Sequence, residues 1–186
     1  ELSHQPGFLS SCLDLIADPQ VESLVKLSTA INIKNIISQN WSNVSGLQQV
    51  SSGNNKDILI SDEEKNVIKS KLMEIIMNIT HLSLNNSNSK YEDIHDLLNL
   101  KKNQLLPILS TILNIDFRAT NDNHIFLESV ADMIVNSGND FAKIYSGLYC
   151  LKEICRTFRW SPNKSRSDIL DPIISKMFPV LIEISN

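Results

Sequence analysis

Long stretches of this chain carry apolar residues every three or four positions, and short polar clusters separate them. This spacing is typical of amphipathic helices and differs from the alternation expected of strands. Glycine (5) and proline (6) are scarce among the 186 residues, whereas a β-sandwich or barrel needs turn residues every 8 to 12 positions. We therefore predict an all-α fold, with helical segments at residues 8–17, 20–41, from 62 onward, 91–115, 125–135, 140–160 and 166–184.

Several local signals mark where these helices begin, end or bend. Asp18 and Pro19 are expected to end the first segment, because proline cannot donate the backbone hydrogen bond that continues a helix. Ser61 followed three residues later by Glu64 fits a capping box, which indicates a helix start. Pro107 lies inside the segment 91–115 and is expected to kink it.

The segments group into helix pairs that recur at roughly 45 residues, a length typical of two-helix solenoid repeats. The expected repeats are residues 2–41, 62–115, 123–160 and a final incomplete one at 166–185. We predict an α-solenoid of antiparallel helix pairs, about three and a half repeats long, that forms one domain over residues 1–186.

Two of the expected helices have separate apolar and polar sides. In the segment 20–41 the apolar side carries Ala30, Ile33, Ile37 and Trp41, and the polar stripe carries Ser28, Asn32, Asn35 and Gln39. In the segment 140–160 the apolar side carries Ile144, Leu148, Leu151, Cys155 and Phe158, and the polar side carries Ser146, Tyr149, Glu153, Arg156 and Thr157. The apolar side of each helix is expected to pack and the polar side to be displayed.

Composition excludes several classes of function. The net charge of −4 offers no basic field for nucleic acid, and no apolar run is long enough for membrane insertion. Cys12, Cys150 and Cys155 have no disulfide or zinc-ribbon spacing, which favours a reducing intracellular compartment. Catalytic, cofactor and metal-site signatures are absent, so we expect a protein that binds rather than catalyses. The start at Glu1 rather than at methionine suggests a fragment or a processed chain, and the first residues have no signal-peptide pattern.

Several segments in order resemble a known family. They are Leu9 to Trp41, Ser61 to Lys65, Asn114 to Phe117, Tyr145 to Leu151, Phe158 to Trp160 and Phe178 to Leu181. The first of them resembles the N-terminal domain of importin-β-type nuclear transport receptors (karyopherins). The second and third resemble the start and the close of the next repeat of that domain. The last three resemble the third and fourth repeats of the importin-seven/importin-eight branch of that family.

This resemblance implies a karyopherin built of HEAT repeats, whose inner helices bind the small GTPase Ran in its GTP form. Such receptors carry protein cargo and shuttle between cytoplasm and nucleus. The residues that the resemblance matches are Lys34, Asn35 and Gln39, and Lys34 lies off the polar stripe. Helical phase alone adds Asn103, Ser110 and Asn114 on the second inner helix and Ser146, Tyr149 and Glu153 on the third.

Two other classes of protein remain open at this point. A HEAT-repeat scaffold or assembly subunit outside nuclear transport would share the packing pattern without binding Ran. An all-α enzyme is disfavoured because no catalytic constellation is recognisable. The sequence leaves open the cargo, the direction of transport and whether nucleoporins bind this part of the protein.

Overall fold

The computed structural model describes residues 5–41, 60–85, 91–119, 124–158, 171, 175 and 177–183, and all regular structure in these ranges is helical. The helices are α1 (Phe8–Ala17), α2 (Ser23–Asn40), α3 (Asp62–Asn85), α4 (Tyr91–Leu100), the π-helical turn η2 (Lys101–Leu105), α5 (Leu106–Ala119), α6 (His124–Val135) and α7 (Phe141–Phe158). Residues 177–183 are helical as well. The predicted all-α fold is confirmed.

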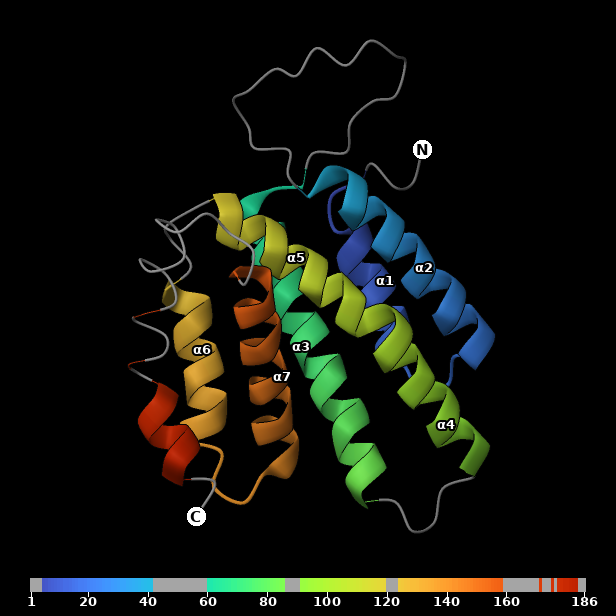
Figure 1. Cartoon of the computed structure of the whole chain (residues 1–186). Coiled ribbons are helices and arrows are strands. Elements are labelled where there is room, and N and C mark those ends of the chain that lie inside the picture. The colour runs from blue at the N-terminus through green and yellow to red at the C-terminus, as the bar shows by residue number, and fades with distance from the viewer. Residues whose placement is uncertain are drawn as a thin grey trace. The chain divides into compact units, whose positions relative to one another are not determined.

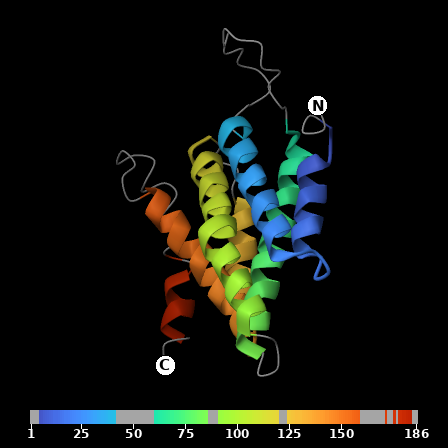
Figure 2. The ribbon, with the colours of Figure 1, turned by 90° about the vertical axis from the view of Figure 1, so that its right-hand side faces the viewer.

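The chain forms two compact units, residues 1–112 and 113–186, and the boundary falls inside α5. Within the first unit α1 packs against α3, while α2 packs against α4 and η2. Helices α1 and α2 also contact each other, as do α3 and α4. Figures 1 and 2 show the resulting two layers, with α1 beside α3 and α2 beside α4. Stacking of each helix on its counterpart in the next pair is the arrangement of a two-helix solenoid.

Polar contacts tie the first helix of one pair to the first helix of the next. The Ser61 hydroxyl accepts a hydrogen bond from the Glu64 amide at 3.2 Å, which is the forward half of the predicted capping box. The Glu64 carboxylate accepts instead from the amide of Gly7, at 3.1 Å, where the chain enters α1 with φ of +81°. Farther along the same two helices, Lys71 donates to the Asp14 carboxylate at 2.7 Å. The start of α3 therefore caps α1 as well as itself.

The core of the first unit is aliphatic, with Trp41 at the end of α2. The predicted apolar side of α2 is confirmed, because Ala30, Ile33, Ile37 and Trp41 are all buried. The opposite layer contributes buried residues from α1 and α3, among them Leu9, Leu13, Ile16, Ile68, Leu72 and Ile76. Helix α1 ends at Ala17, directly before the predicted stop at Asp18 and Pro19.

The irregularity expected near Pro107 takes the form of the π-helical turn that precedes it. The amide of Leu106 donates to the Lys101 carbonyl, five residues back, instead of four. A wider turn spares the carbonyl of residue 103 from the clash that a proline ring causes four residues later in a regular α-helix. Helix α5 then continues to Ala119, four residues beyond the predicted end at 115.

In the second unit α6 and α7 form an antiparallel pair. A glycine permits their close approach: a Cβ atom at Gly147 would lie 2.6 Å from Cγ1 of Ile134 and 3.3 Å from Cβ of Met133. These distances are at or below ordinary contact, so the α6–α7 pair depends on the missing side chain. Cys150, one turn further along α7, is buried.

We expect the Cys150 thiol to be protected from modification. Burial, reinforced by the nearby Glu153, raises its pKa to about 12 from an ordinary 9.0. At pH 8 a thiol-specific disulfide reagent is expected to modify the exposed Cys155 and to reach Cys150 only on unfolding, because the thiolate is the nucleophile.

The same shift in pKa predicts how the stability of the second unit depends on pH. Between pH 9 and 12 the unfolded state loses the Cys150 proton and the folded state keeps it, so stability falls as pH rises. Denaturant titrations at pH 8 and pH 10.5 test this. A Cys150→Ala variant that loses stability as steeply as the wild-type chain over that interval would contradict the assignment.

Residues 42–59, 86–90, 120–123 and 159–170 lie outside the described residues, and so does most of the predicted helix 166–184. The single domain over residues 1–186 stays a prediction. In the described helices, no stretch is both long and apolar enough to cross a membrane.

Candidate protein-interaction surface

Helix α2 is packed on one side and open on the other. Its packed side contacts α1, α4 and η2. The predicted polar stripe of Ser28, Asn32, Asn35 and Gln39 is exposed throughout. A helix anchored in this way can present side chains to another macromolecule without opening its own core.

Exposed apolar side chains share this open side with the polar stripe. Leu24 is 75% exposed and Ile31 is 42% exposed, and Leu27 lies between them. Their spacing of three and four residues places them on one ridge of the helix. Sequence reasoning missed this ridge because it divided the helix into one apolar and one polar side. The available signal was that Leu24, Leu27 and Ile31 are apolar but lie outside the helical phase of Ala30 and Ile33. A surface that mixes apolar anchors with polar groups is typical of protein interfaces.

The candidates matched by resemblance lie on or beside this surface. Asn35 and Gln39 are exposed, and Lys34 is half-buried. The backbone carbonyl of Lys34 accepts a hydrogen bond from the Ser38 hydroxyl at 2.7 Å. The ammonium group of Lys34 takes no part in this bond. We call the exposed α2 residues Leu24, Leu27, Ser28, Ile31, Asn32, Asn35 and Gln39 the α2 face.

The candidates of the second inner helix are divided between the two units. Asn103 is exposed in η2, which packs against α2, and Ser110 is half-buried in α5. Both belong to the first unit, together with the α2 face. Asn114 belongs to the second unit, and its side-chain oxygen is buried without a hydrogen bond from any described residue.

The polar side predicted for α7 is displayed less than expected. Ser146 is 1% exposed and Glu153 is 2% exposed, whereas Cys155, assigned to the packed side, is exposed. The expectation that Ser146 and Glu153 are displayed is therefore wrong. Small residues explain part of this rotation, because Ser146 and Gly147 allow close packing on a side that hydrophobicity alone marks as polar.

Tyr149 is half-buried beside this buried carboxylate. Burial, followed by the charge of Glu153, raises the pKa of the Tyr149 phenol to about 12. The Glu153 carboxylate lies 3.8 Å from the Arg156 guanidinium and 4.0 Å from the Lys152 ammonium. These groups form a charge network on α7, in which the carboxylate is buried and the two cations are exposed. Within the described residues, no three His, Cys, Asp or Glu side chains gather where they could hold a metal ion.

Comparison with known proteins supports the resemblance to importin-β. Residues 1–78 match the family described as the Importin-beta N-terminal domain. Over 182 residues the chain is 31% identical to "Nonsense-mediated mRNA decay protein 5" of Saccharomyces cerevisiae, an alignment that covers 97% of this chain and 15% of that protein. The chain thus spans 15% of the length of this relative. No solved structure matches the chain.

Proposed function

We propose that the chain is the N-terminal part of a nuclear transport receptor that binds Ran-GTP through its inner helices. In this proposal the receptor belongs to the importin-seven/importin-eight branch, binds protein cargo and shuttles between cytoplasm and nucleus. It acts by binding rather than by catalysis. The α2 face supports the proposal most strongly, because it combines exposed apolar and polar side chains on a helix already held by α1, α4 and η2.

The nucleotide state of Ran tests this proposal. We expect the chain, and the full-length protein that contains it, to bind Ran loaded with GTP more tightly than Ran loaded with GDP in isothermal titration calorimetry. A difference between the two states arises only if the partner makes contacts in one state that it lacks in the other. Equal binding of both forms, or of neither by the full-length protein, would favour a HEAT-repeat scaffold outside nuclear transport.

A matched pair of substitutions tests whether the α2 face makes the contact. Ile31→Asp places a charge on the α2 face and is expected to weaken Ran-GTP binding about tenfold or more, as loss of an interface anchor does. Val67→Asp is the control, because Val67 is 44% exposed on α3, close to the 42% of Ile31, but lies in the other layer. A double Asn35→Ala and Gln39→Ala variant examines the polar candidates. If Val67→Asp weakens binding as much as Ile31→Asp does, the contact lies elsewhere.

A further inference from the structure

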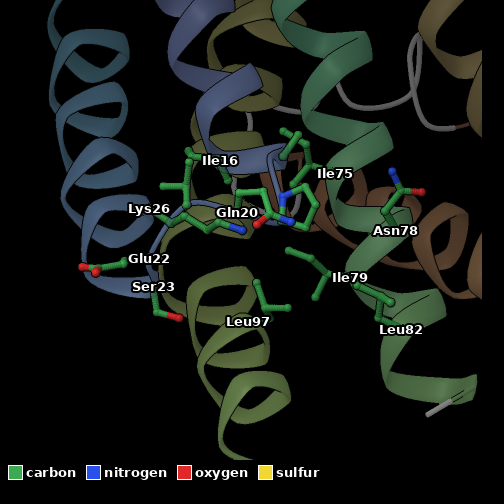
Figure 3. A pocket seen from close by; sticks show the side chains of 13 residues that line it. Ile16, Gln20, Glu22, Ser23, Lys26, Ile75, Asn78, Ile79, Leu82 and Leu97 are labelled. Carbon is green, nitrogen blue, oxygen red and sulfur yellow. The ribbon is translucent and has the colours of Figure 1, made fainter. Parts of the chain in front are cut away.

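Besides the α2 face, the first unit has a cavity of about 390 Å³ where both helix pairs meet. Figure 3 shows it between the end of α1, the start of α2, the second half of α3, and α4. One part of its wall is aliphatic, from Ile16, Ile75, Ile79, Leu82 and Leu97, and the rest includes polar side chains such as Gln20, Ser23 and Asn78. This volume falls in the range of small-ligand sites.

One cationic side chain is directed into this cavity. Figure 3 shows the Lys26 ammonium pointing inward beside Gln20, whereas the carboxylate of Glu22 points away. Lys26 is 6% exposed, and it lies in the helical phase of Ala30, Ile33 and Ile37 on α2. Its ammonium group has no hydrogen bond or ion pair with any described residue, although Asp18 is near enough to act on it electrostatically.

The cost of burying this ammonium group is visible in its ionisation. Burial lowers the pKa of Lys26, and the charge of Asp18 opposes that effect only in part. Lys101, a second buried lysine in the described part of this unit, differs because its ammonium donates to the Thr80 hydroxyl at 3.0 Å. A buried charge without a partner destabilises the fold, so an anion that enters the cavity gains a strong interaction in a poorly solvated place.

We propose that this cavity binds a carboxylate carried on an apolar body of the size of a leucine or phenylalanine side chain. The carboxylate pairs with the Lys26 ammonium, and the hydrocarbon part fills the aliphatic wall. Two sources have this chemistry: a free small carboxylic acid, and the C-terminal residue of a peptide. None of the residues that line the cavity belongs to the α2 face.

Titrations with defined probes test the site. Octanoate supplies the free acid, and acetyl-Gly-Gly-Leu with a free or an amidated C-terminus supplies the peptide. Methyl resonances of the cavity residues Ile16, Ile75 and Ile79 report binding, and Ile134 in the second unit is the internal control. We expect saturable shifts at the cavity residues with octanoate and weaker shifts with octanol, which lacks the charge. Binding by the free-acid peptide assigns the site to chain termini, and binding by octanoate alone assigns it to free acids.

Substitutions of Lys26 decide whether the ammonium group is responsible. Lys26→Met keeps the length of the side chain and removes the charge, so it is expected to fold and to bind octanoate about tenfold more weakly or worse. Lys26→Arg is expected to retain binding, whereas Leu97→Trp is expected to block the cavity with Lys26 unchanged. Lys143→Met, at an exposed lysine of α7, is the matched control. Octanoate binding equal to that of octanol, unchanged by Lys26→Met, or absent with both probes would overturn the proposal.

Discussion

Replacing Gly147 with leucine is expected to destabilise the α6–α7 pair by about 3 kcal/mol, as strong overpacking does. Even the first added carbon would lie 2.6 Å from Cγ1 of Ile134, a distance that non-bonded carbons do not adopt. The three further carbons of leucine enlarge the clash. Denaturant titration followed by far-ultraviolet circular dichroism measures the loss. Faster reaction of the buried Cys150 thiol with a disulfide reagent would show that the loss of stability lies in the second unit.

Two further variants separate this clash from a general effect of altering α7. Lys143→Leu adds an apolar side chain at an exposed position of the same helix and is expected to change stability by less than about 0.5 kcal/mol. Gly147→Ala combined with Ile134→Ala removes the closest contact and is expected to be more stable than the sum of the two single changes predicts. Strict additivity of the pair would show that Gly147 and Ile134 do not touch.

Replacing Trp41 with alanine is expected to cost the first unit about 3–5 kcal/mol. Trp41 is 1% exposed at the end of α2, and its ring lies 5.8 Å from the Lys65 ammonium at the start of α3. The substitution therefore leaves a large cavity and removes a cation–π contact between the two helix pairs. Chemical denaturation followed by circular dichroism measures the change.

The control for this substitution lies on the same helix. Leu24→Ala shortens a side chain that is largely exposed on the α2 face, so its effect on stability is expected to stay within about 0.5 kcal/mol. Should the two substitutions cost the same, Trp41 does not pack in the core as described.

The sequence predicted α2 well because each of its sides has a distinct composition. Apolar residues at Ala30, Ile33 and Ile37 recur with the helical period, and they are buried as expected. The Asp18 and Pro19 stop and the Ser61 cap act through the local backbone, so they too can be read from the residues themselves. The same reasoning could not foresee that Glu64 caps a second helix, since its partner Gly7 is 57 residues away.

Helix α7 and Lys26 show where that reasoning fails. A hydrophobic pattern gives no weight to Gly147 and Ser146, although small residues set how closely two helices approach. Glu153 then lies buried on a side that its charge marks as exposed. The sequence pattern does not predict a buried Lys26, because lysine is rarely buried. Its helical phase, four residues before Ala30 and seven before Ile33, was the available signal.

Hydrogen exchange of the chain with and without Ran-GTP tests most directly the claim that the layer of α2, α4 and η2 is the binding surface. We expect slower amide exchange in α2 and η2 on binding, with α1 and α3 little changed. We also expect Ran-GDP at the same concentration to give less protection. Protection confined to α1 and α3, or identical protection by both nucleotide states, would contradict it.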